Sequence, residues 1–150
     1  MCSIPVPASQ WPTNIPLRCF TEAVPAGFPS PAQGYEDDPL DLNTLCVKHP
    51  AATYFARLEG DSLIDAGMYD GDMLIVDRSL KVVSGVYVVA AVDGEFTCKQ
   101  YYDNPPRLVP RNEAYSTIYL DRVQQHEHFG VVAGVLRLFK RISRASRRLT

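Results

Sequence analysis

The sequence lacks the features of several functional classes. Its four cysteines form no CxxC pair, and no histidine is spaced to complete a zinc site with them, which argues against a zinc-binding fold. The longest strongly apolar run, residues 86–92, is far shorter than the ~20 residues of a membrane-spanning helix. No basic and apolar leader opens the sequence. We therefore expect reduced thiols, a cytoplasmic location and no membrane contact.

The sequence also has little net charge, with a formal value of −2 at pH 7. Residues 140–150 hold five basic side chains and no acid, so the other 139 residues carry ten basic against seventeen acidic groups. A mildly acidic body is not typical of a protein that holds DNA through counterion release. The basic tail is suited to a phosphate backbone or an acidic partner, but such tails are more often solvated chain ends.

Proline is scarce except at the start of the chain. Eight of the twelve prolines fall in the first 39 residues, and no apolar period survives them there. This distribution predicts an extended arm over 1–39, a domain over 40–139 and a basic tail over 140–150. The alternative for the arm is a disordered tail. Its aromatic side chains favour packing on the domain or on a partner chain: Trp11, Phe20, Phe28 and Tyr35.

The 46% hydrophobic content and the turn signals after residue 40 indicate a compact, mostly β domain. Asp93-Gly94 lies between two apolar runs and predicts a hairpin with a type I′ turn. One short helix is expected from about Ser62 to about Met68. We expect antiparallel strands with partial barrel character at 53–58, 73–76, 86–92, 95–102, 107–110, 117–120 and 129–139.

Ser62 is the first candidate for chemistry. It follows a predicted strand within Gly60-Asp61-Ser62-Leu63, where a tight turn can expose its Oγ and gather backbone N–H groups. Without a base, a serine in this position is usually only a helix N-cap.

The histidines do not supply that base in the pattern of GDSL esterases, which open with the same four residues. Those enzymes need Asp-x-x-His, and none of His49, His126 and His128 has an acid three positions before it. His126-Glu127-His128 offers alternate strand positions to a metal, but two lone histidines are more often surface polar residues. No metal site is predicted.

Lys99 is the second candidate. It is expected in the middle of the strand after Asp93-Gly94, beside the apolar strand 86–92. Burial disfavours an ammonium ion and lowers the pKa of lysine, so a buried Lys99 would be available as a general base. Serine as nucleophile with a neutral lysine as general base is a known catalytic combination. The alternative is a lysine on an exposed strand face.

Several ordered motifs now identify a family. The chain resembles the UmuD/MucA-type SOS mutagenesis proteins, which belong with the LexA-like self-cleaving serine peptidases, over roughly residues 24–139. The matching segments, in order, are Ala26-Gly27-Phe28-Pro29-Ser30-Pro31-Ala32, His49-Pro50-Ala51-Ala52-Thr53-Tyr54-Phe55, Gly60-Asp61-Ser62-Leu63, Asp70-Gly71-Asp72-Met73-Leu74-Ile75-Val76-Asp77, Ala91-Val92-Asp93-Gly94-Glu95-Phe96-Thr97-Cys98-Lys99 and Gly130-Val131-Val132.

The resemblance implies a LexA-like β domain with an extended N-terminal arm. It implies Ser62 as nucleophile, Lys99 as general base and the backbone N–H groups of Asp61 and Ser62 as oxyanion donors. It also implies cleavage of the chain's own Ala26–Gly27 bond, so that 1–26 is removed and 27–39 stays with the mature protein. No cofactor is implied.

The resemblance further implies partners. In such families a RecA filament on single-stranded DNA stimulates cleavage, and the processed homodimer joins a Y-family polymerase subunit similar to UmuC in error-prone translesion synthesis. Contact with DNA would then be indirect.

Three other interpretations stand beside this one. The first is a non-catalytic module that binds polymerase or RecA and carries a vestigial dyad. The second, a LexA-like repressor, needs a DNA-reading head, and 26 proline-rich residues are too few for three packed helices. The third, an enzyme like signal peptidase, would normally need a membrane anchor.

Overall fold

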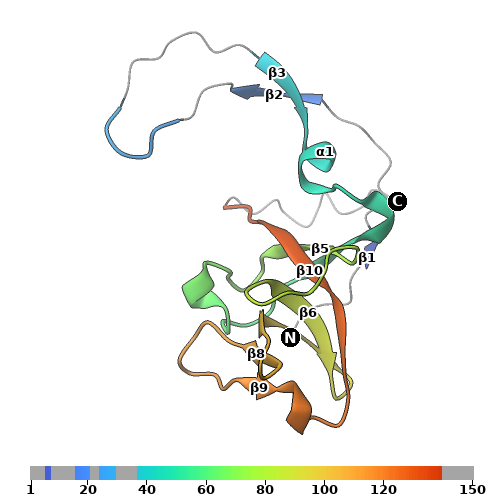
Figure 1. Ribbon diagram of the computed structural model, residues 1–150. Coiled ribbons are helices and arrows are strands. Elements are labelled where there is room, and N and C mark those ends of the chain that lie inside the picture. Colours follow the sequence, from blue (N-terminus) through green and yellow to red (C-terminus); the bar gives the residue numbers. More distant parts are fainter. Residues whose placement is uncertain (1–5, 8–15, 21–23, 30–36, 140–150) are drawn as a thin grey trace, which may run out of the picture.

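The computed structural model describes residues 6–7, 16–20, 24–29 and 37–139. Its main feature is an eight-stranded sheet in which every neighbouring pair is antiparallel (Figure 1). In spatial order the strands are β1 (Val6–Pro7), β4 (Thr53–Arg57), β5 (Met73–Asp77), β10 (His126–Leu136), β6 (Tyr87–Val92), β7 (Glu95–Tyr102), β8 (Arg107–Val109) and β9 (Ile118–Tyr119). The prediction of a mostly β, antiparallel domain is confirmed.

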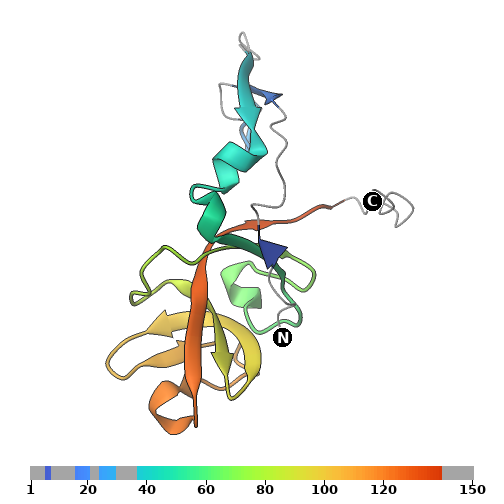
Figure 2. The same ribbon diagram turned by 90° about the vertical axis from the view of Figure 1, so that its right-hand side faces the viewer.

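A second, two-stranded sheet stands away from this body. It pairs β2 (Pro16–Phe20) with β3 (Asp37–Asp41) and projects from the domain in both views (Figures 1 and 2). The helices are all short: α1 (Leu42–Cys46) and the 3-10 turns η2 (Pro50–Ala52), η3 (Ile64–Ala66) and η4 (Leu120–Arg122).

The hairpin of β6 and β7 follows directly from its turn residues. Asp93 and Gly94 have φ values of 48° and 84°, the left-handed backbone that a type I′ turn requires at both central positions. Val92 then pairs with Glu95, and this register places Lys99 opposite Val88. The predicted hairpin is confirmed.

The core lies on both faces of the sheet, in two clusters of buried side chains. Val89 belongs to one cluster, while its neighbours Val88 and Ala90 belong to the other. Because β6 is covered on both faces, its sequence shows no alternation of polar and apolar residues. The first cluster contains Ala56, Leu58, Leu63, Met68, Leu74, Val76, Val89 and Cys98. The second contains Val88, Ala90, Tyr101, Leu108, Leu120 and Val131.

Strand β10 joins the two halves of the sheet, because it pairs with β5 on one side and β6 on the other. A Cβ atom added at Gly130 would lie 2.8 Å from Val76 Cγ1, closer than packed carbon atoms approach. Glycine at this position therefore lets β10 lie close to β5, beside a register shift between His128 and Gly130.

Several predicted boundaries were wrong. The last strand covers 126–136 rather than 129–139, and the helix near Ser62 is a 3-10 turn of three residues. It stays short because Gly67 adopts the left-handed conformation at φ 78° directly after it. Strand β9 is also shorter than predicted, since Leu120 is buried at the start of η4.

Only part of the predicted arm can be compared. Its described residues form β1, β2, most of β3 and an exposed segment over 24–29. Phe28 is 95% exposed, so its ring does not pack on the domain of this chain. Trp11, Tyr35 and the side chain of Phe20 lie outside what the structure describes.

An ion pair fixes the end of β10 to the loop before β5. Arg137 donates from Nε and Nη2 to the two carboxylate oxygens of Asp72, at 2.6 and 2.5 Å, and also to the carbonyl of Gly67 at 2.7 Å. Asp72 is only 2% exposed. The hydrogen bond from Arg137, aided by one from the Tyr69 amide, holds the pKa of Asp72 below its ordinary value of 3.8.

We predict that Arg137→Ala destabilises the protein by about 2 kcal/mol at pH 7, because it leaves a buried carboxylate without its cation. A carboxylate with a lowered pKa stabilises the fold above its unfolded pKa, and that contribution disappears as pH falls through the folded pKa. Urea unfolding should therefore show a deficit in the variant's free energy of unfolding that is full at pH 7 and becomes smaller as pH falls below 3.8. The part that remains comes from the lost hydrogen bond to the Gly67 carbonyl and the lost contact with the Tyr69 ring.

Arg122→Ala is the matched control, since Arg122 is exposed and only lies over the Tyr119 ring. It should cost less than about 1 kcal/mol. A deficit in Arg137→Ala that does not change with pH would contradict a role for the charge of Asp72.

Candidate active site

Ser62 lies on a turn between β4 and η3, at the edge of the first core cluster. Gly60 opens this turn with φ 87°, a backbone that favours glycine. Leu63, the next residue after Ser62, is fully buried in that cluster. The turn therefore projects a half-buried serine while its neighbour anchors the backbone.

Lys99 reaches Ser62 from the middle of β7. Its Nζ donates to Ser62 Oγ at 2.9 Å, to Thr97 Oγ1 at 2.9 Å and to the backbone carbonyl of Cys98 at 3.2 Å. Lys99 is 8% exposed, and its partner across the hairpin, Val88, is fully buried. The interpretation of Lys99 as a residue on an exposed strand face is therefore wrong. The fold brings together a serine and a lysine that are 37 positions apart.

The hydrogen-bond partners of Lys99 suit both protonation states of the amine. An ammonium ion has three N–H donors, and three acceptors surround this Nζ. A neutral amine has two N–H donors and a lone pair, so it can donate to Thr97 and Cys98 and accept the hydroxyl proton of Ser62. The arrangement can therefore take a proton from Ser62 and hold it.

The backbone N–H groups of Asp61 and Ser62 lie on the same turn. Within the described residues, no hydrogen bond of the protein occupies either group. The carbonyl oxygens of both residues, by contrast, accept hydrogen bonds from the loop between β8 and β9.

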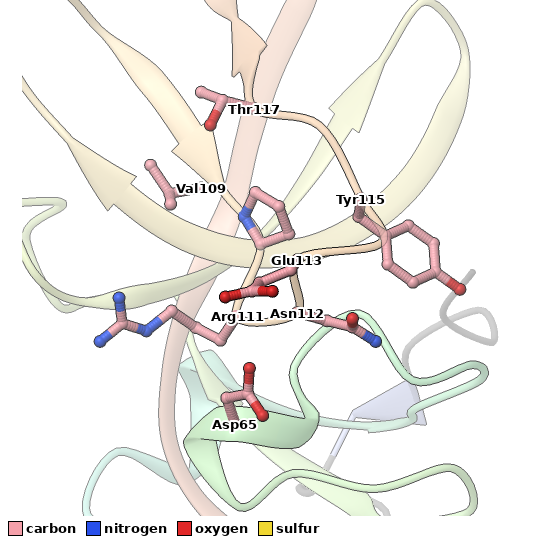
Figure 3. A pocket seen from close by; sticks show the side chains of 8 residues that line it. Asp65, Val109, Arg111, Asn112, Glu113, Tyr115 and Thr117 are labelled. Atoms are coloured by element: carbon pink, nitrogen blue, oxygen red, sulfur yellow. The ribbon is translucent and has the colours of Figure 1, made fainter.

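That loop, residues 110–117, was not predicted as part of the site. The Asn112 side chain donates to the Asp61 carbonyl at 2.9 Å, and the Arg111 amide donates to the Ser62 carbonyl at 2.7 Å. Tyr115 donates its hydroxyl to Asp61 Oδ1 at 2.5 Å, and this bond to a carboxylate raises the pKa of Tyr115. The loop also lines an open cavity of about 320 Å³ together with Asp65 of η3 (Figure 3). A polar loop between two short strands carries no sequence signal that would have identified it.

The structure does not bring Ala26 and Gly27 to Ser62. Residues 24–29 are exposed, and a Cβ atom on Gly27 would have no neighbour within 4 Å. This segment belongs to the connection between β2 and β3, and both views place it at the projecting sheet, away from η3 (Figures 1 and 2). The described conformation is therefore an undocked one.

The histidines lie apart from this site. The ring of His128 is half-buried against Tyr101, with ring centroids 5.1 Å apart, and burial lowers the pKa of His128. The His126 ring lies 6.1 Å from the His128 ring. Over the described ranges, no three His, Cys, Asp or Glu side chains gather as metal ligands would.

The structure describes the side chains of two of the four cysteines: that of Cys98 is buried and that of Cys46 is half-buried. Cys2 and Cys19 fall where side chains are not described. Among the described helices, none has the length and apolar character needed to cross a membrane.

Comparison with known proteins gives a family match and several relatives. The family model described as Peptidase S24-like matches residues 19–133. Protein SamA of Salmonella typhimurium is 43% identical over 132 residues, which are 87% of this chain and 92% of that protein. Protein MucA of Escherichia coli is 46% identical over 115 residues, 75% of this chain and 79% of that protein.

A LexA repressor, from Stenotrophomonas maltophilia, is 37% identical over 128 residues. These cover 84% of this chain but only 60% of the repressor. The family match spans most of the chain, and the relatives of similar extent are the MucA-like proteins rather than the longer repressor. The chain therefore belongs to the S24-like peptidase family, as a protein of the UmuD/MucA type.

Proposed function

We propose that this protein is a self-cleaving peptidase that acts in SOS mutagenesis and cuts its own Ala26–Gly27 bond with a Ser62–Lys99 dyad. The observation that carries the proposal is the 2.9 Å contact between Ser62 Oγ and a buried Lys99 Nζ in a member of a peptidase family. The processed form would be a homodimeric subunit of a Y-family translesion polymerase, and a RecA filament on single-stranded DNA would stimulate the cut.

The chemistry uses each contact of the dyad. As Ser62 Oγ attacks the carbonyl carbon of Ala26, the neutral amine of Lys99 takes the hydroxyl proton. The negative charge that develops on the carbonyl oxygen is stabilised by the N–H groups of Asp61 and Ser62. Thr97 and the Cys98 carbonyl accept from Lys99 throughout, so the ammonium ion that forms has these two acceptors besides Ser62 Oγ.

The bond then breaks and the dyad is restored. Lys99 gives its proton to the amide nitrogen of Gly27, which leaves as a new N-terminus, and Ala26 stays as an ester on Ser62. Water attacks this ester and transfers a proton to Lys99, which returns a proton to Ser62 Oγ. The products are residues 1–26 and 27–150.

Control of the reaction would lie in docking of the arm, because Ser62 and Lys99 are already in contact while Gly27 is exposed. The 25 residues from Phe28 to Ala52 can span up to about 80 Å when extended, which is ample for the scissile bond to reach a dyad. A RecA filament would act by favouring the docked arrangement, which is a shift between populations.

Cleavage would also remove two strands from the structure. Residues 1–26 contain β1, which pairs with β4, and β2, which pairs with β3. The strands are short, two residues in β1 and five in β2. After the cut they are no longer tethered to the domain, so their effective concentration beside β4 and β3 falls and only their own contacts hold them there. Their departure would leave β3 without its partner strand and β4 as an edge of the main sheet, and another protein's strand can add to either.

The proposed dyad is tested by self-cleavage. At alkaline pH the purified protein should yield fragments 1–26 and 27–150, with a rate that rises with pH as more Lys99 becomes neutral. Ser62→Ala and Lys99→Ala should lose at least about a hundredfold in rate. Lys99→Arg should be inactive near neutrality because a guanidinium stays charged. Mass spectrometry of timed samples measures both fragments.

Lys81→Arg is the matched control, since Lys81 is an exposed lysine and should tolerate the change. A chain that stays intact after long incubation at high pH, with and without RecA, ATP and single-stranded DNA, would favour a non-catalytic accessory module with a vestigial dyad. A rate that is flat from neutral to alkaline pH would argue against lysine as the base.

A separate prediction concerns the released strands. Processed protein, separated from small fragments by gel filtration, should exchange amide hydrogens in β3 and β4 faster than the uncleaved Ser62→Ala chain. Peptides from the β6–β7 hairpin are the internal control, because both strands keep their neighbours. Mass spectrometry measures the exchange of each peptide. Strand release would be contradicted if residues 1–26 eluted together with the processed protein and exchange in β3 and β4 were unchanged.

A further inference from the structure

The loop between β8 and β9 holds the turn of Ser62 through contacts that the proposed reaction does not itself use. Side chains and backbone of this loop, residues 110–117, bond to both carbonyls of the Asp61-Ser62 pair and to the Asp61 carboxylate. A further bond, from the Asp65 amide to the Arg111 carbonyl at 2.9 Å, joins the same loop to η3.

The Asn112 contact acts on a particular peptide plane. The Asp61 carbonyl accepts from the Asn112 side chain at 2.9 Å and, more weakly, from the Ile64 amide at 3.2 Å. It shares one peptide unit with the Ser62 N–H, and a trans peptide points its C=O and N–H in opposite directions. Fixing the carbonyl therefore fixes the direction of the N–H. The amide of Arg111 fixes the next peptide unit in the same way, through the Ser62 carbonyl.

Tyr115 makes a further contact with Asp61. Its hydroxyl donates to Asp61 Oδ1 at 2.5 Å, while its ring is 45% exposed. Figure 3 shows Asn112 and Tyr115 on the loop that passes beside η3. Both side chains thus reach Asp61 from outside the core, so they can be changed without opening a cavity.

We infer that Asn112 and Tyr115 are positioning residues that orient the backbone N–H of Ser62 toward the oxyanion. Their side-chain hydrogen bonds go to Asp61 and, for Asn112, to Ala114 rather than to Ser62 Oγ or Lys99, so in this proposal they act through Asp61. This inference rests on the proposed function, because it needs an oxyanion at Ser62.

Asn112 offers an unusually sharp test, because its amide has two separate roles. Its Nδ2 donates to the Asp61 carbonyl, while its Oδ1 accepts from the Ala114 amide at 3.0 Å. Asn112→Asp keeps the shape and the acceptor for Ala114, removes the donor to Asp61 and adds a negative charge. Asn112→Ala removes both contacts without adding charge.

Self-cleavage should slow about ten- to a hundredfold in both Asn112→Asp and Asn112→Ala, and about threefold to tenfold in Tyr115→Phe. Rates are measured across the alkaline range by mass spectrometry, and thermal unfolding confirms that the variants are folded. In Asn112→Ala the rate should fall by the same factor at every pH, because the dyad keeps its contact. A disturbed Ser62–Lys99 pair would move the pH profile instead.

Tyr119→Phe is the control for Tyr115→Phe, since it removes a hydroxyl from the neighbouring strand β9 and should leave the rate unchanged. A wild-type rate in Asn112→Asp would overturn the inference, as it would show that the amide only shapes its own loop. A slow Asn112→Asp beside a wild-type Asn112→Ala would also overturn it, since charge alone would then explain the effect. If Ser62→Ala still cleaves, the proposed function itself fails, which is a separate result.

Discussion

The contact between Ser62 and Lys99 depends on how the core holds the backbone on each side of it. Leu63 and Cys98, the sequence neighbours of the two residues, belong to the same buried cluster. Packing in that cluster brings the turn after β4 against the middle of β7, and the polar side chains meet at 2.9 Å as a consequence. A lysine that is 8% exposed is tolerated there because its amine has hydrogen-bond acceptors and its stem lies beside apolar residues.

Local signals were enough to predict the parts of the site that a single turn controls. Asp93-Gly94 set the hairpin register, and that register put Lys99 in the middle of a strand paired with β6. From the residues alone, a Ser62–Lys99 pair was one of two open interpretations, and the family resemblance favoured it, because no local rule joins positions 37 residues apart. The loop at 110–117 was missed for the same reason: its hydrogen bonds to Asp61 span 51 and 54 residues.

The arm shows a different limit of sequence reasoning. Its prolines indicated extended backbone, which is confirmed at the described strands β1, β2 and β3, and composition placed the arm's end at residue 39. In the structure that position lies inside β3, where Pro39 pairs with Arg18 of β2. Proline lacks a backbone donor but is accepted in an edge strand, so composition alone does not mark where a two-stranded sheet ends. Pairing of β1 with β4 was equally hidden, because two residues carry no periodic pattern.

Under the proposed function, the topology accounts for how an uncut arm could be kept beside the dyad. A preformed dyad would consume a docked arm at once, since tethering makes cleavage unimolecular and tolerates a slow catalyst. In the proposed function the arm is instead held in pairings of its own, β1 on β4 and β2 on β3, while the scissile bond stays exposed between β2 and β3. Docking must compete with those pairings, and strands this short make the competition close enough for a partner to decide it. In the proposed function the same weakness would release the fragment after the cut, because a segment held by so few contacts has little affinity once the tether is gone.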